Sequence, residues 1–144
     1  MGAGTKVRTS VVTGANRGIG RETALGLARA GHRVVLACRN MEEAERAARE
    51  IRVSSGNPEV FARRLDLASL DSIREFAKVF EKDFGLIHGL VNNAGVARLG
   101  GERTAEGFEA NVGVNFFGTF ALTSLLLPLF DRREIGRASC RERV

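Results

Sequence analysis

A glycine-rich stretch at residues 11–20 constrains this chain more than any other part of its sequence. A β-branched apolar run enters it and a helical pattern leaves it, with Gly14, Gly18 and Gly20 between them. So tight a turn from strand to helix requires residues without a Cβ, which also let a ligand approach the backbone. The following helix, beginning near Ile19, presents free N–H groups and the positive end of its dipole, which suits phosphate. We predict that this loop holds the pyrophosphate of a dinucleotide; a purely structural turn is the alternative.

Hydrophobic periodicity predicts strands alternating with helices along the rest of the chain. Strands are expected at residues 7–13, 33–38, 59–65 and 86–91. Helices are expected at residues 18–30, after a cap at Asn40, after a cap at Ser69, and from Thr104 or Ala105 to about Leu129. Glu43 stands where a capping-box partner of Asn40 would be. The order implies an α/β fold, with a parallel, doubly wound sheet that stops after about four strands.

The chain divides into part of one domain and a tail. Residues 1–133 fit the N-terminal part of a single domain, because a complete domain of this order needs roughly 200–250 residues. Residues 134–144 do not continue the apolar pattern and are dense in arginine. This tail resembles the in-frame translation of a widely used sequencing adapter, so we expect it not to be native and leave it out of fold reasoning. An ordinary charged terminus is the alternative.

Composition limits which partners the protein is expected to bind and in which cellular compartment it is expected to occur. The net charge is +5, but the arginines are scattered and accompany no RNA- or DNA-binding motif, so no nucleic-acid partner is expected. Two cysteines, Cys38 and Cys140, are too few for a disulfide framework, which fits a reducing, cytoplasmic location. The apolar segment 116–130 is short for a membrane span, so we expect no membrane segment but a core or interface helix.

The end of the second predicted strand indicates which dinucleotide is bound. Sites that prefer NAD usually place an acidic residue there for the ribose 2′-OH, whereas arginine suits the 2′-phosphate of NADP. Here the strand ends with Cys38, Arg39 and Asn40, and no acid is present. Arg17, inside the glycine loop, is a second guanidinium that could reach the same phosphate. The two arginines together favour NADP(H), although either alone could be a solvated surface charge.

The ends of the third and fourth predicted strands complete the predicted site, since ligands of open α/β sheets lie outside the carboxyl ends of the strands. Asp66 can accept from an adenine amino group, Asn93 can brace neighbouring strands, and the small Ala94 and Gly95 leave room for a cofactor. Without this context Asp66 would be an ordinary acid near a helix and the asparagines a turn. The predicted cofactor residues are Gly14, Asn16, Arg17, Gly18, Ile19, Gly20, Arg39, Asn40, Asp66, Leu67, Asn93, Ala94 and Gly95.

Four ordered motifs resemble those of the short-chain dehydrogenase/reductase family. They are the glycine run at residues 13–20, the pair Asp66-Leu67, the Asn-Asn-Ala-Gly run at residues 92–95, and Val114-Asn115. The details at residues 36–40, 65–70 and 114–123 resemble its retinol-dehydrogenase-like branch. The likeness spans about residues 6–130.

The resemblance implies a Rossmann-type fold and NADP(H)-dependent hydride transfer between an alcohol and a carbonyl. By position Asn115 matches the family's catalytic asparagine, which interrupts its helix and holds a water in the proton relay. A polar side chain in an otherwise apolar helix also needs a partner or a role; a buried, satisfied asparagine is the alternative. The resemblance further implies a small alcohol or carbonyl substrate, retinoid- or lipid-like, and a homodimeric parent. Anchored relatives make association with the endoplasmic reticulum membrane the alternative to a cytoplasmic location.

The rest of the family's acid/base machinery is not found in this sequence. The family uses a tyrosine, a nearby lysine and a serine on later elements, whereas this chain contains no tyrosine and its last lysine is Lys82. Proton transfer at neutral pH requires a group of tuned pKa within reach of the substrate. We therefore expect an active parent oxidoreductase of which this chain is the cofactor-binding half, inactive alone. The alternative is a non-catalytic short isoform that acts as a nucleotide-binding or interaction module.

Overall fold

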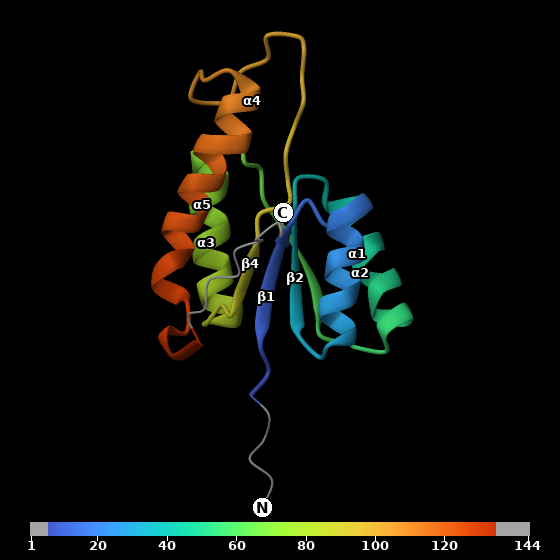
Figure 1. Ribbon diagram of the computed structural model, residues 1–144. Coiled ribbons are helices and arrows are strands. Elements are labelled where there is room, and N and C mark those ends of the chain that lie inside the picture. Colours follow the sequence, from blue (N-terminus) through green and yellow to red (C-terminus); the bar gives the residue numbers. More distant parts are fainter. Residues whose placement is uncertain (1–5, 135–144) are drawn as a thin grey trace, which may run out of the picture.

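All four strands pair in parallel, in the order β3-β2-β1-β4 (Figure 1). β1 (Thr9–Thr13) lies between β2 (Arg33–Cys38) and β4 (Gly89–Val91), and β3 (Val60–Arg64) pairs with β2. α1 (Gly18–Arg29) and α2 (Met41–Ser55) cover one face, while α3 (Leu70–Phe84) and α5 (Thr119–Leu126) cover the other. This computed structural model describes residues 6–134. It confirms the predicted parallel, doubly wound sheet; residues 135–144 of the predicted tail lie outside the described residues.

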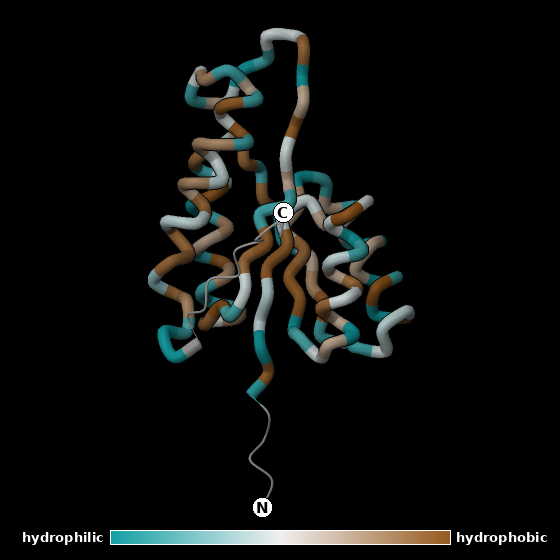
Figure 2. The backbone as a smooth tube through the Cα atoms, in the orientation of Figure 1, coloured by the Kyte–Doolittle hydropathy of each residue, from teal (hydrophilic) through white to brown (hydrophobic). Residues whose placement is uncertain are grey.

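The core lies in two layers, one on each side of the sheet. Successive strand residues point to opposite faces, so Val12 packs under α1 and α2 while Val11 packs under α3 and α5. Both valines are fully buried. Because both faces are covered, the inner strand β2 is a continuous apolar run after Arg33 rather than an alternating one, and Figure 2 shows hydrophobic residues in the middle of the sheet.

The last helical run begins later than predicted. α4 (Ala110–Val112) continues into a π-helical segment, η1 (Gly113–Gly118), then α5, and ends in η2 (Leu127–Leu129); a short turn, η3 (Arg132–Glu134), follows. The predicted start at Thr104 or Ala105 is wrong. Glu109 caps the helix, because its carboxylate accepts the N–H groups of Asn111 and Val112, and these donors hold its pKa below the usual range.

The run Ala110–Leu129 has 20 residues and contains an 18-residue stretch with a mean hydropathy of 1.6, so it is long and apolar enough to cross a membrane by length and composition. It is thus longer than the apolar segment 116–130 on which the expectation of no membrane segment rested. Leu122 and Leu126 are fully buried in the core layer that also contains residues of α3. Phe116, Phe120 and Leu127 are exposed on the same run.

The chain leaves this run along the free edge of β4. Phe130 forms a parallel bridge to Ile87, whose N–H donates to Leu129 O and whose carbonyl accepts from Asp131 N. The Asp131 carboxylate, 7% exposed, accepts from Lys6 Nζ at 2.9 Å, and His88 Nε2 lies 3.9 Å away. These contacts hold residues 129–131 beside Ile87, at the position where a fifth parallel strand would begin.

We expect Asp131→Asn to lower the free energy of unfolding at pH 7, and the difference from wild type to shrink at pH 3. The hydrogen bond from Lys6, followed by that from the Arg133 N–H, lowers the pKa of Asp131 from its usual 3.8. A lowered folded-state pKa gives stability that is present above the unfolded-state value and lost as pH falls toward the folded-state value.

Urea unfolding of both proteins at the two pH values measures this difference. Asp71→Asn is the control, because the Asp71 side chain is 95% exposed and its pair with Arg74 contributes little. An equal gap between wild type and Asp131→Asn at pH 3 and pH 7 would refute the assignment.

Candidate dinucleotide site

The glycine loop has the geometry that its sequence predicts. Gly14 and Gly18 have φ angles of +64° and +59°, a left-handed conformation that favours glycine. Arg17 is the N-cap residue of α1 but makes no side-chain capping bond. The first N–H groups of α1 therefore remain available to a ligand, at the positive end of the helix dipole.

The end of β4 is fastened directly to this loop. Asn93 Nδ2 donates to Thr13 O at 3.0 Å and to Gly14 O at 3.3 Å. In return the Thr13 hydroxyl oxygen accepts the N–H groups of Asn93 (3.0 Å) and Ala94 (2.9 Å). The bracing role expected of Asn93 is present. Thr13 was part of the motif but was not predicted to contribute a side chain.

We expect Gly20→Ala to destabilise the protein by about 2 kcal/mol or more, because the new methyl group has no space. A Cβ at Gly20 would overlap Asn93 Nδ2 and lie 2.6 Å from Gly14 O. Chemical denaturation measures the effect. Gly26→Ala is the matched control on the same helix, since nothing lies within 4 Å of its Cβ position. Helix propensity predicts that this control is more stable than wild type by about 0.5–1 kcal/mol, and equal stability of the two variants would contradict the packing argument.

A cavity of about 620 Å³ opens at the carboxyl ends of the strands, a size in the range of ligand pockets. The predicted residues that line it are Gly14, Asn16, Arg17, Gly18, Arg39, Asn40, Asp66, Leu67, Asn93, Ala94 and Gly95. Three predicted residues do not line it. Ile19 is 80% exposed, Gly20 is buried beneath the loop, and Asn115 bonds to the neighbouring chain segment instead.

Arg17 and Arg39 both line this cavity, and neither side chain makes a hydrogen bond or ion pair within residues 6–134. Asp66 is partly engaged, because Oδ1 accepts the Ala68 N–H at 2.9 Å; Oδ2 bonds to no group in the described part of the chain. Asn40 Oδ1 caps α2 by accepting the Glu43 N–H. The arrangement thus leaves two guanidinium groups and one carboxylate oxygen available to a ligand.

Sequence reasoning missed several residues of the cavity wall. Glu43 does not complete a capping box but accepts from Asn16 Nδ2 at 2.6 Å, which brings a carboxylate into the cavity. Arg98, Glu102 and Arg103 also line it from the loop after β4. No sequence signal places them there, because that loop has no periodic pattern.

Cys38 contributes a thiol at the end of β2, on the cavity wall. Burial raises its pKa to about 11, against the opposing effect of the Ala15 and Asn16 N–H groups. The thiol is therefore neutral at physiological pH and is not a nucleophile. It serves as a small buried side chain.

Asn115 lies within the π-helical segment η1, so the helix is irregular where the resemblance implied an interruption. Such segments occur often at functional sites. Asn115 is exposed, so the buried alternative is wrong. Its side chain nevertheless has a partner, because Oδ1 accepts the Val96 N–H and Nδ2 donates to Val96 O, both at 2.8 Å.

Comparison with known proteins agrees with this geometry. A family model described as short chain dehydrogenase matches residues 8–138. Retinol dehydrogenase 11 of Mus musculus is 53% identical over 120 residues, covering 83% of this chain and 38% of the relative. Retinol dehydrogenase 13 of Mus musculus is 55% identical, covering 83% of this chain and 36% of the relative. A solved metagenomic short-chain oxidoreductase in complex with NADP has a TM-score of 0.74 and 37% identity, over 85% of this chain and 56% of that one.

The chain belongs to the short chain dehydrogenase family, as its four motifs predicted. Its similarity to retinol dehydrogenases is confirmed as well. It spans 38% and 36% of the length of these two curated relatives.

Proposed function

We propose that this chain is the NADP(H)-binding half of an oxidoreductase that transfers hydride between an alcohol and a carbonyl. The observation that carries the choice of cofactor is the pair Arg17 and Arg39, both on the cavity wall and both without side-chain partners among the described residues. No acid follows β2 to bind a ribose 2′-OH. A structural neighbour in complex with NADP supports the same choice.

The cavity residues fit each part of this cofactor. A Cβ at Gly18 would meet nothing within 4 Å, so the open start of α1 can take the pyrophosphate. Arg17 and Arg39 hold the 2′-phosphate with charge-assisted hydrogen bonds. Asp66 Oδ2 accepts from the adenine amino group, and Leu67 packs against the base. Asn16, Asn40, Asn93, Ala94 and Gly95 complete the wall, and Ile19 and Gly20 shape the loop from outside the cavity.

When bound, the cofactor supplies or accepts the hydride. We assign Asn115 the family's water-holding role through its backbone, because Val96 already engages both its Oδ1 and its Nδ2. A π-helical segment breaks the regular backbone hydrogen-bond pattern, which suits that role. Since the sequence contains no tyrosine, we expect this chain alone to bind NADP(H) without turnover. In the parent protein, residues that correspond to the part of the relatives that this chain does not cover would then supply the general acid and the substrate pocket.

The substrate class follows from the relatives, which are retinol dehydrogenases. We propose a retinoid- or lipid-like alcohol or aldehyde for the parent protein, and a homodimer that uses the exposed face of the run Ala110–Leu129. We propose a cytoplasmic location. Association with the endoplasmic reticulum membrane, as in anchored relatives, is the alternative.

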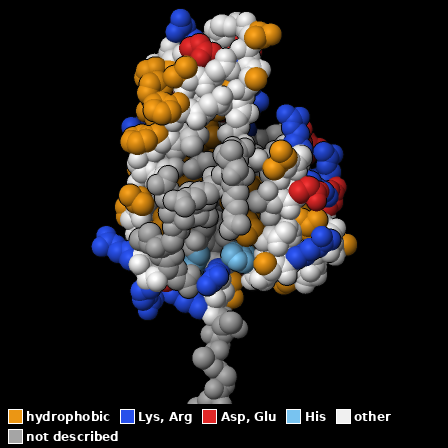
Figure 3. Space-filling view, in the orientation of Figure 1, with side chains coloured by type: hydrophobic (Ala, Val, Ile, Leu, Met, Phe, Trp, Pro, Cys, Tyr) orange, Lys and Arg blue, Asp and Glu red, His pale blue; other side chains and the backbone are white. Residues whose placement is uncertain are grey.

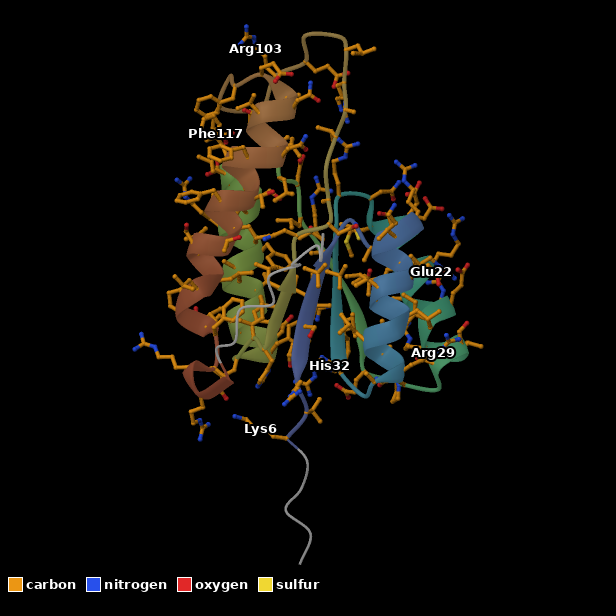
Figure 4. All side chains as sticks on the ribbon, in the orientation of Figure 1. Lys6, Glu22, Arg29, His32, Arg103 and Phe117 are labelled. Carbon is orange, nitrogen blue, oxygen red and sulfur yellow. The ribbon has the colours of Figure 1, made fainter. Side chains whose placement is uncertain are left out.

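We expect Arg39→Ala and Arg17→Ala each to weaken NADPH binding by about tenfold or more, as for lost hydrogen bonds between charged groups. NADH affinity stays unchanged, because NADH lacks the 2′-phosphate. Quenching of intrinsic cofactor fluorescence measures both. Arg29→Ala is the matched control, since Arg29 is exposed at the far end of α1 (Figure 4). Wild-type protein that binds NADH as tightly as NADPH would refute the assignment.

A second candidate function, a non-catalytic interaction module, is favoured by one observation. Phe116, Phe120 and Leu127 are each more than 60% exposed, and hydrophobic side chains gather over this side of the molecule in Figure 3. Monomeric proteins rarely expose large contiguous apolar patches. Cofactor binding without turnover fits both candidates, so the test is the full-length transcript: a downstream Tyr-x-x-x-Lys motif supports the oxidoreductase, and its absence the module.

A further inference from the structure

Two asparagines one helical turn apart hold the segment that follows β4. The Arg98 N–H donates to Asn111 Oδ1, and Asn111 Nδ2 donates to Arg98 O, both at 2.8 Å. Asn115 makes the same reciprocal pair with Val96. Each side-chain amide thus takes the place of a neighbouring strand's peptide group, satisfying one donor and one acceptor of the backbone.

The spacing explains why both pairs form together. Asn111 lies in α4 and Asn115 lies four residues on in the π-helical segment η1, so both side chains leave the continuous helical run on nearly the same side. Their partners lie two residues apart on the segment after β4. Asn111 and Asn115 therefore match Val96 and Arg98 in register. In an extended segment, residues two apart present their backbone groups on the same edge, so a helix face can bond both.

The segment held in this way is a wall of the cavity. Val96 and Arg98 line it, as do Ala110 and Val114, the helix residues immediately before Asn111 and Asn115. Val96 and Val114 belong to one apolar cluster with Leu67, which lines the same cavity. An apolar surface with Asp66 beside it fits a purine base, whose amino group donates and whose faces are apolar.

We propose that Asn111 is a positioning residue for the adenine end of the cofactor. Asn111 acts through Val96 and Arg98, because it holds their backbone against the helix. The distance between Val96 and Leu67, which line the space for the purine base, is thereby kept constant. Asn115 alone would fix one point of this segment and leave it free to pivot, whereas two bonded points fix its direction. The inference rests on the proposed NADP(H) function and assigns Asn111 no contact with the reacting atoms.

The test compares Asn111→Ala and Asn111→Gln with wild type. The glutamine keeps both amide groups on a side chain one methylene longer, whereas an aspartate would place a carboxylate against Glu109, whose Oε1 accepts from Asn111 Nδ2 at 2.8 Å. Three probes are titrated: NADPH, adenosine 2′,5′-bisphosphate, and inorganic pyrophosphate, which reports on the glycine loop alone. We expect Asn111→Ala to weaken binding of both adenosine ligands about tenfold, Asn111→Gln to weaken it less, and pyrophosphate binding to stay unchanged.

The control is Val112→Ala, next to Asn111 but with its side chain 49% exposed, which leaves all three affinities unchanged. Hydrogen exchange of the Arg98 amide is followed in parallel. It should speed up in Asn111→Ala, while the amides of β1 keep their protection. This readout separates local release of the segment from loss of global stability, and Asn111→Gln retains the test if the alanine variant does not fold.

The outcomes separate this inference from the function on which it rests. Wild-type protein that binds neither adenosine ligand would refute the proposed function, and the inference with it. Wild-type binding with unchanged affinity in Asn111→Ala would refute the inference alone. A parallel loss of pyrophosphate affinity would do the same, because it would show general loosening of the site.

Discussion

The close junction between the glycine loop and the end of β4 is the contact on which the candidate site depends. Four hydrogen bonds join residues 13–14 to residues 93–94 there: the Asn93 side-chain amide donates to the carbonyls of Thr13 and Gly14, and the Thr13 hydroxyl oxygen accepts the N–H groups of Asn93 and Ala94. Gly20 lies so close beneath them that it cannot carry a Cβ. Parallel strands are joined by long crossovers rather than by tight turns. Side-chain hydrogen bonds of this kind therefore fix the position of the glycine loop after β1 relative to the segment after β4.

Asparagine side chains also bond to the backbone of another segment further along the chain. β4 has only three residues, and beyond it the backbone leaves the sheet without a partner strand. The amides of Asn111 and Asn115 then supply the missing donors and acceptors, from a helix that contributes Ala110 and Val114 to the cavity. Backbone polar groups need such partners wherever regular pairing stops. Satisfying them also fixes the wall against which a cofactor would pack.

The cavity wall carries charges of both signs. The guanidinium groups of Arg17 and Arg39 have no side-chain partner among the described residues. The carboxylates are engaged: Glu43 accepts from Asn16, Glu102 pairs with Arg98, and one oxygen of Asp66 accepts from Ala68. Because the Asn16 amide already donates to the Glu43 carboxylate, this carboxylate is less available to a ribose 2′-hydroxyl than an acidic residue at the end of β2 would be. The balance of available groups is therefore cationic, which agrees with a phosphate-bearing cofactor rather than with a free 2′-hydroxyl.

The amino-acid sequence was enough to predict the strand–helix order, the glycine loop, the helix caps at Asn40 and Ser69, and the family, because these depend on residues close together in the chain. The wall of the site could not be predicted without the tertiary fold. Asn16 meets Glu43 across 27 positions, and Asn93 meets Thr13 across 80. The helix start at Ala110 was missed because Glu109 caps it after a turn that has no apolar period. A periodic pattern encodes which face of an element is buried, but not which distant polar group completes its hydrogen bonds.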